Sequence, residues 1–176
     1  AFEALEQARA VPGSGILPHS ALLILAARTG KPLRQAWWDD MDGRLRRFPI
    51  GPQETNSMAA LMKCMREGAC HFPLPELDAM YRAALSHGPN AEVLNLQADY
   101  AFNGLHEADA ALALWRRAIA LAPNEPQYRI NRARVLIATG RDAEARGEIA
   151  ALRAIGSAGD TESMARDLEA RMARPR

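Results

Sequence analysis

The sequence predicts an all-α protein built as a solenoid, in which antiparallel helix pairs are stacked one after another. Apolar residues recur at the three- and four-residue spacings of helices that are buried on one side. Positions also repeat every 34 residues: Pro89-Asn90 recurs as Pro123-Asn124, and Trp115 follows Tyr81 at the same distance. A repeat of this length indicates successive helix pairs, because each pair needs its neighbours to bury its apolar side.

The 34-residue register extends over many independent positions around Trp115. Where helices meet at the same points in successive pairs, small residues are expected to follow small ones and large apolar residues to follow large ones. The further residues at this distance are Ala84 and Ala118, Leu85 and Ile119, Phe102 and Leu136, His106 and Gly140, Ala111 and Ala145, and Trp115 and Ile149.

Proline and glycine mark the ends of two complete helix pairs. Pro123 closes the first pair, because proline cannot continue a helix. Pro126 suits the first turn of the next helix, and Gly140 suits the end of that helix, where a positive φ is needed. These signals predict helices over residues 91–105, 109–121, 126–139 and 142–154.

Weaker patterns extend the prediction to the rest of the chain. They predict helices at 53–67 and 76–87, an earlier hairpin at 18–29 and 32–47, Pro/Gly-rich linkers at 11–17 and 48–52, and a terminal helix at 161–173 with polar residues outside. The predicted organisation is an N-terminal helical hairpin with linkers (residues 1–52), three helix pairs (53–154, divided at about 53–89, 90–123 and 124–154) and a capping helix with a tail (155–176).

Composition and charge exclude some classes of partner. The 176 residues carry a formal net charge of +1, which predicts no attraction to nucleic acid. The longest apolar run, Ala21 to Ala27, is far shorter than the about 20 residues of a membrane span. Because the chain starts at Ala1 and not at Met, we expect a processed form or a piece of a longer protein. A membrane link would then run through a segment outside this chain.

The two cysteines, Cys64 and Cys70, flank a short turn that contains glycine. This spacing favours a disulfide in an exported protein, with two inert thiols as the alternative. A zinc site that adds His71 and His87 is a weaker alternative, because a Cys-x5-Cys-His spacing is not a known finger pattern. We therefore predict neither a metal nor a cofactor.

No pattern of catalytic residues stands out, so the sequence predicts a protein that is not an enzyme. The histidines are scattered, and His106-Glu107 lacks the second histidine of a zinc-protease helix. Gly13-Ser14-Gly15 matches part of a nucleophile elbow, but Pro12 places it in a linker. No phosphate-binding loop motif occurs.

Trp37-Trp38 is followed by Asp39, Asp40 and Asp42. One interpretation is a carbohydrate platform, in which an aromatic ring lies beneath a sugar and carboxylates bind its hydroxyls. The favoured interpretation is an amphipathic helix with one tryptophan in the core, the other half exposed, and a solvated acidic edge.

The repeat resembles the tetratricopeptide-repeat family. The resemblance lies in the 34-residue period, in small residues where helices touch, in a large residue between them, and in a closing proline. The residues that carry it are Ala111, Trp115, Ala118 and Pro123, then Gly140, Ala145 and Ile149. Asp99 and Arg132-Ala133 depart from the Leu-Gly that the family favours, and His106 stands where it favours glycine. The resemblance implies a right-handed solenoid whose first helices line a concave groove.

Partners commonly bind in such a groove. After the apolar stripe is removed, the residues expected to face it are Gln97, Tyr100, Asn103, Gln127, Asn131 and Arg134. Amides can bind an extended peptide backbone, and Arg134 can bind a carboxylate with two parallel hydrogen bonds. The alternative is that these are ordinary solvated side chains. The predicted function is a scaffold that binds a peptide or a protein segment.

A second resemblance is to the C-terminal soluble region of bacterial membrane O-antigen polymerases and ligases. It is carried by Arg28-Thr-Gly-Lys-Pro, by Trp37-Trp38, by the Cys-x5-Cys turn and by the run from Ala120 to Asn131. It implies a periplasmic domain beside glycan-transfer machinery, with the catalytic residues on a membrane part outside this chain. A cytoplasmic scaffold is the alternative.

Overall fold

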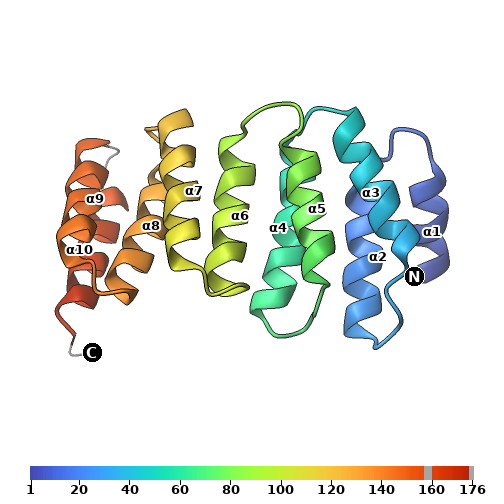
Figure 1. Ribbon diagram of the computed structural model, residues 1–176, viewed down its shortest axis with the longest axis horizontal. Helices are drawn as coiled ribbons and strands as arrows, with labels where there is room; N and C mark the ends of the chain where they lie inside the picture. The colour runs from blue at the N-terminus through green and yellow to red at the C-terminus, as the bar shows by residue number, and fades with distance from the viewer. Residues whose placement is uncertain (157–159, 175–176) are drawn as a thin grey trace. The chain divides into compact units, whose positions relative to one another are not determined.

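Ten α-helices and no β-strand make up the part of the chain that the structure, a computed structural model, describes: residues 1–156 and 160–174 (Figure 1). The predicted all-α class is confirmed. The helices are α1 (Phe2–Ala10), α2 (Leu17–Arg28), α3 (Gln35–Arg47), α4 (Pro52–Arg66), α5 (Leu74–Ala84), α6 (Ala91–Asn103), α7 (Ala108–Leu121), α8 (Pro126–Ala138), α9 (Asp142–Ala154) and α10 (Asp160–Met172).

The 34-residue period is visible in the helix boundaries. The second helices of three successive pairs, α5, α7 and α9, begin at residues 74, 108 and 142. Their eighth residues are Tyr81, Trp115 and Ile149, which are 0%, 2% and 2% exposed. Trp115 and Ile149 therefore occupy the same buried position in their helices, as the register predicts. The helices form sequential pairs, consistent with a repeat-like stack.

The turns that end the first helices repeat as well. After α2, α4 and α8, a glycine with positive φ (Gly30 at 66°, Gly68 at 68° and Gly140 at 77°) is followed by a residue whose backbone N–H bonds back to the last turn of the helix. The turn after α6 instead places His106 at φ 60°, 34 residues before Gly140. An L-residue in this conformation is strained, because its Cβ crowds the following carbonyl oxygen.

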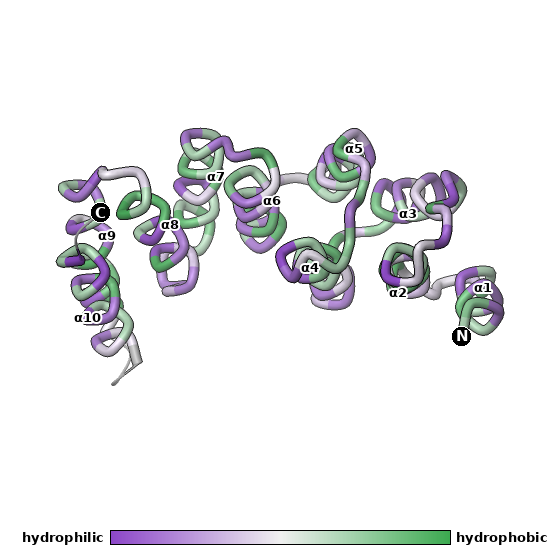
Figure 2. Tube along the Cα trace, turned by 90° about the horizontal axis from the view of Figure 1, so that it is seen from below, coloured by the Kyte–Doolittle hydropathy of each residue, from purple (hydrophilic) through white to green (hydrophobic). Residues whose placement is uncertain are grey.

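The chain divides into two compact units, Ala1–Leu96 and Gln97–Arg176, with the boundary inside α6. In the first unit, α2 contacts α1, α3 and α4, and α3 packs on α5. Figure 2 shows apolar and polar residues alternating around these helices, as expected for helices that are each buried on one side. The large core residues of this unit include Ile16, Leu22, Leu23, Trp37, Trp38, Met41, Leu45, Met58, Leu61, Leu77, Met80, Tyr81 and Leu94.

Helix α1 is not predicted by the sequence pattern. It contains no fully buried residue, and its apolar side is marked only by half-buried Phe2 and Leu5, so its pattern is too sparse to recognise. Polar contacts attach it to α3: the Trp37 indole donates to Glu6 at 2.9 Å, and Arg44 donates to the backbone oxygen of Arg9 at 2.9 Å.

The structure joins Cys64, near the end of α4, to Cys70 in the connection to α5 by a disulfide, with the two Cα atoms 5.3 Å apart. The bond closes the glycine-containing turn that lies between the two cysteines in the sequence. Phe72, two residues after Cys70, packs its ring edge-to-face on Trp38 with the ring centres 5.8 Å apart. The connection is therefore fixed to α4 by the disulfide and to α3 by this ring contact.

In the second unit, α8 contacts α7, α9 and α10, and α9 also contacts α10. Their shared core consists of Ile130, Ala133, Ile149, Leu152, Ala165 and Leu168. Helix α10 directs Ala165 and Leu168 into this core, while Arg166, Asp167 and Glu169 are exposed. The terminal helix thus covers one apolar side and presents a polar one, as predicted for a capping helix.

No helix among the described residues combines the length and the apolar character that are needed to cross a membrane.

The left-handed conformation of His106 gives a stability prediction. We expect His106→Gly to be more stable than the wild type by about 1 kcal/mol, because glycine removes the Cβ strain at φ 60°. The side chain of His106 is exposed, so its loss removes little packing. Urea unfolding measures the difference. As the control, Gly140→Ala introduces the same strain at the equivalent position and should be less stable. A less stable His106→Gly variant would contradict this account of the turn.

Candidate functional site

The six residues predicted to line a groove all lie in the second unit, on the C-terminal half of α6 and on α8. Their exposure differs. Asn103, Gln127 and Arg134 are exposed, Gln97 and Asn131 are half-buried, and Tyr100 is buried. The structure therefore supports an accessible polar surface most clearly on α8.

Gln127, Asn131 and Arg134 lie on one side of α8, at spacings of four and three residues. The side-chain amide of Gln127 donates to Asn131 Oδ1 at 2.8 Å, which holds both amides in position. Arg134, one turn further on, is exposed and has no hydrogen bond or ion pair with any described residue. We call these three residues the α8 strip.

Tyr100 is not part of an exposed surface. It is 3% exposed, and its ring lies so close to Gly104 that a Cβ on this glycine would be 2.8 Å from Tyr100 Cδ2. The apolar spacing predicts one buried stripe on α6, at Leu94, Ala98, Phe102 and Leu105. The buried residues Val93, Asn95 and Leu96 lie outside this stripe. Asn103, also on α6, donates to Asp99 at 2.9 Å and is thus engaged by its own helix.

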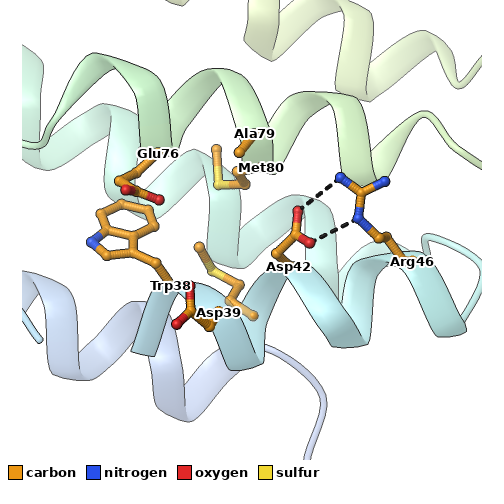
Figure 3. Close-up of a pocket in the computed structure, with 8 residues that line it drawn as sticks. Trp38, Asp39, Asp42, Arg46, Glu76, Ala79 and Met80 are labelled. Atoms are coloured by element: carbon orange, nitrogen blue, oxygen red, sulfur yellow. Dashed lines mark hydrogen bonds and ion pairs between the residues drawn. The ribbon is translucent and has the colours of Figure 1, made fainter. Parts of the chain in front are cut away.

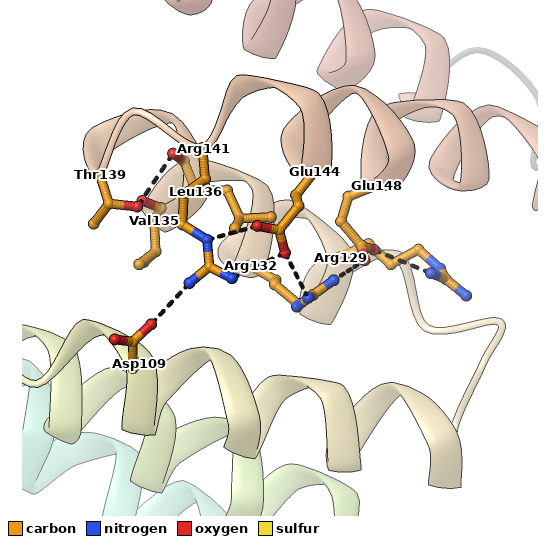
Figure 4. A network of polar contacts seen from close by, with 9 residues as sticks. All are labelled: Asp109, Arg129, Arg132, Val135, Leu136, Thr139, Arg141, Glu144 and Glu148. Carbon is orange, nitrogen blue, oxygen red and sulfur yellow. Dashed lines mark hydrogen bonds and ion pairs between the residues drawn. The ribbon is translucent and has the colours of Figure 1, made fainter.

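A network of ion pairs lies on the opposite side of α8 and is not predicted by the sequence analysis (Figure 4). Glu148 of α9 receives hydrogen bonds from both Arg129, at 3.1 Å, and Arg132. The side chains of Arg129, Arg132 and Glu148 are 18%, 17% and 11% exposed. Removing one partner from such a shielded cluster leaves an uncompensated charge. Arg132, which departs from the repeat pattern, is explained by this pairing with Glu148.

Arg141 extends the network from the α8–α9 turn to a third helix. It bonds to Glu144 at 2.7 Å and to Asp109 at the start of α7 at 2.8 Å (Figure 4). The hydrogen bond from Arg141 lowers the pKa of the Glu144 carboxyl. The charged groups behind the α8 strip therefore link α7, α8 and α9. A charge pattern of Arg at 129 and 132 against Glu at 144 and 148 is the signal that could have revealed this pairing.

Both tryptophans of the first unit are buried, at 2% and 3% exposed, so the prediction that one would be half exposed is wrong. Trp37 stacks on Phe2 with the ring centres 6.4 Å apart. The guanidinium carbon of Arg34 lies over the Trp37 ring, 5.5 Å from the ring centre. Trp38 packs against Phe72. Neither indole offers the open face that a carbohydrate platform needs.

A small pocket of about 200 Å³ lies beside Trp38, between α3 and α5 (Figure 3). Asp42 and Arg46 form a two-bond ion pair at its edge, with distances of 2.8 and 3.2 Å. Asp39 and Glu76 add carboxylates. The pocket is smaller than most ligand sites, which range from roughly 300 to 1,000 Å³, and its arginine is already neutralised.

No group of three or more metal-ligating side chains occurs among the described residues. The alternative zinc site would need Cys64 and Cys70, whose sulfurs are bonded to each other and are not thiolates. His71 and His87 are exposed.

His19 is a buried titratable group at the start of α2, with an exposed fraction of 0%. Burial lowers the pKa of its imidazole to about 4 from the ordinary 6.5, and the positive charge of Arg44 adds to the effect. The carboxylate of Asp40, 3.9 Å from Nε2, acts in the opposite direction. His19 is therefore neutral at neutral pH.

Comparison with known proteins assigns the chain to no family. No family model matches it, and no curated protein and no solved structure matches it either.

The buried imidazole of His19 predicts a pH-dependent stability. Between pH 6.5 and about 4 the unfolded chain binds a proton at His19 and the folded chain does not, so the free energy of unfolding falls as the pH falls. The neutral imidazole of His19 makes its full contribution to the free energy of unfolding above pH 6.5. By pH 4 the loss of this contribution is on the order of 3 kcal/mol.

Urea unfolding at several pH values tests this, because His19→Gln cannot titrate and should lose less stability between pH 7 and 4 than the wild type. The exposed His87→Gln controls for the loss of a histidine and should keep the wild-type slope. Equal slopes for all three proteins would show that His19 is not a buried neutral group.

Proposed function

We propose that the chain is a non-enzymatic scaffold of the tetratricopeptide-repeat type, a right-handed solenoid that binds a peptide or protein segment along its first helices. The observation that carries the proposal is the α8 strip: three polar side chains on one side of a first helix, of which Arg134 is exposed and unpaired among the described residues. The recurrence of helix starts at 74, 108 and 142 supports the repeat assignment.

The chemistry of the α8 strip suits an extended peptide that contains a carboxylate. The amides of Gln127 and Asn131 offer donors and acceptors to a peptide backbone. The guanidinium of Arg134 can form two parallel hydrogen bonds to an acidic side chain or to a chain terminus. The ion pairs behind the strip hold α8 against α9, so the strip is ordered before a partner binds, which reduces the entropic cost of binding.

A second candidate function is a periplasmic accessory domain of a membrane glycan polymerase or ligase, with the catalytic part elsewhere. The Cys64–Cys70 disulfide favours it, because such bonds persist mainly in exported proteins. A cytoplasmic scaffold would be expected to hold two thiols.

Peptide capture tests the scaffold. A peptide is selected against the wild-type protein from a displayed random library, and its Kd is measured by fluorescence anisotropy. We expect Arg134→Ala to weaken binding by about tenfold or more, because a charge-assisted hydrogen bond contributes roughly 1.5–3 kcal/mol. Gln127→Ala should have a smaller effect.

The matched control is Arg146→Ala, which removes an exposed arginine of α9 that has no partner among the described residues. It should bind like the wild type. Equal weakening in Arg134→Ala and Arg146→Ala, or no selected peptide at all, would count against the α8 strip. Tyr100 is unsuitable as a probe, since truncating this buried ring would also destabilise the fold.

The compartment is tested by alkylating the denatured protein from its native cells, with and without prior reduction. In an exported protein we expect Cys64 and Cys70 to react only after reduction. Full alkylation without reductant would exclude the periplasmic alternative.

A further inference from the structure

A cleft of about 510 Å³ lies in the first unit, between the C-terminal end of α1 and one side of α3. This volume is within the range of small-molecule sites. Five α3 residues line it, and four of them, Asp40, Gly43, Arg44 and Arg47, are spaced so that they share one side of the helix. We call this the arginine cleft. It does not involve the α8 strip, so nothing about it depends on the proposed scaffold function.

Two arginines that line the cleft, Arg44 and Arg47, form no ion pair with a described carboxylate. Arg9 forms ion pairs with Glu6 and Asp40, and Arg34 also pairs with Glu6, so two arginines balance two carboxylates. Arg44 is half-buried and donates one hydrogen bond to the backbone oxygen of Arg9. Arg47, one turn from Arg44, is exposed and has no partner among the described residues. Two guanidinium groups therefore remain available for an anion.

Gly43 keeps the cleft open between these arginines. It lies within α3, where glycine is less favourable than alanine. Its φ is not in the left-handed region, and a Cβ added to it would meet no atom within 4 Å. Neither the backbone nor the packing thus requires glycine at this position. A larger side chain would occupy the space that a ligand needs.

The remaining lining residues indicate what accompanies the anion. Phe48 is 51% exposed and offers an apolar ring at the rim. Asp39 accepts one hydrogen bond, from Gln35 at 3.0 Å, and has further lone pairs for hydroxyl donors. The volume exceeds that of an isolated anion. The ligand therefore combines an anionic group with a body that carries hydroxyls.

We propose that the arginine cleft binds a small phosphate monoester bearing hydroxyl groups, with Arg44 and Arg47 on the phosphate and Asp39 on a hydroxyl. A phosphate suits this arrangement better than a carboxylate, because its dianion presents three oxygens to two guanidinium forks. The phosphate could belong to a soluble ester or to a lipid headgroup, since both present the same chemistry.

Calorimetry with glucose 6-phosphate, glucose and inorganic phosphate tests the proposal. The wild type should bind the phosphate ester more tightly than inorganic phosphate and should not bind glucose. Arg47→Ala should weaken binding by about tenfold. The matched control is Arg46→Ala, the preceding residue, whose guanidinium pairs with Asp42 on another side of α3. Equal effects of the two variants would mean that only net charge matters and would overturn the site.

Gly43→Leu gives an independent test, because it fills the cleft without removing any charge. It should abolish binding while leaving the unfolding temperature unchanged or higher. Gly147→Leu in α9, where an added Cβ also meets no atom within 4 Å, should bind like the wild type. Backbone amide shifts on ligand addition should concentrate at residues 43–48. Unimpaired binding by Gly43→Leu would place the ligand elsewhere.

Phosphatidylcholine vesicles with and without phosphatidylinositol 4-phosphate, whose headgroup is a phosphate monoester bearing hydroxyls, distinguish the two sources of phosphate. Binding to phosphatidylinositol 4-phosphate that is lost in Gly43→Leu and Arg47→Ala, without binding of the soluble ester, would assign the cleft to a lipid headgroup. Failure of both probes to bind would refute the proposal.

Discussion

Three second helices, α5, α7 and α9, each bury one large side chain at the same position, and the 34-residue repeat of the chain depends on this burial. Tyr81, Trp115 and Ile149 are all nearly inaccessible at the eighth position of their helices. Burying a side chain of this size contributes roughly 2–3 kcal/mol. Because the requirement recurs every 34 residues, the starts of these three helices recur with it, and so do the positive-φ turns at His106 and Gly140. The hydroxyl of Tyr81 adds a bond to the backbone oxygen of Leu96, which attaches α5 to α6.

Helix α8 combines two kinds of polar surface with different physical consequences. On one side, Arg129 and Arg132 share Glu148 in a shielded ion cluster. Such a cluster contributes less to net stability than to the choice of one packing arrangement, because desolvation offsets much of the attraction. On the other side, Arg134 is solvated and incurs no such penalty until a partner covers it. The division separates the residues that hold the helix from those that are available for binding.

Most of the helices can be predicted from the sequence, because helical periodicity and a repeat are local signals. These signals predict nine of the ten described helices close to their observed bounds. Helix α1 is not predicted, because its two half-buried large apolar residues make a weak pattern. The sequence pattern assigns Tyr100 to an exposed surface, because a single apolar stripe does not show that α6 is buried on other sides as well. The arginine cleft and the Glu148 cluster join side chains from different helices. Arg44 and Arg9, for example, are 35 residues apart, and nothing local in the chain records their contact.

The mode of attachment of α1 has a thermodynamic consequence. This helix has no fully buried residue; it contacts α2 and is attached to α3 by the contacts of Glu6, Arg9 and Arg44 and by the stacking of Phe2 on Trp37. Segments with little buried apolar surface detach at a lower free-energy cost than the whole domain. Arg9 and Ala10 of α1 also form one wall of the arginine cleft. A molecule that fills the cleft and contacts this wall binds more tightly when α1 is docked, so occupancy and docking are reciprocally linked and each favours the other by the same free energy.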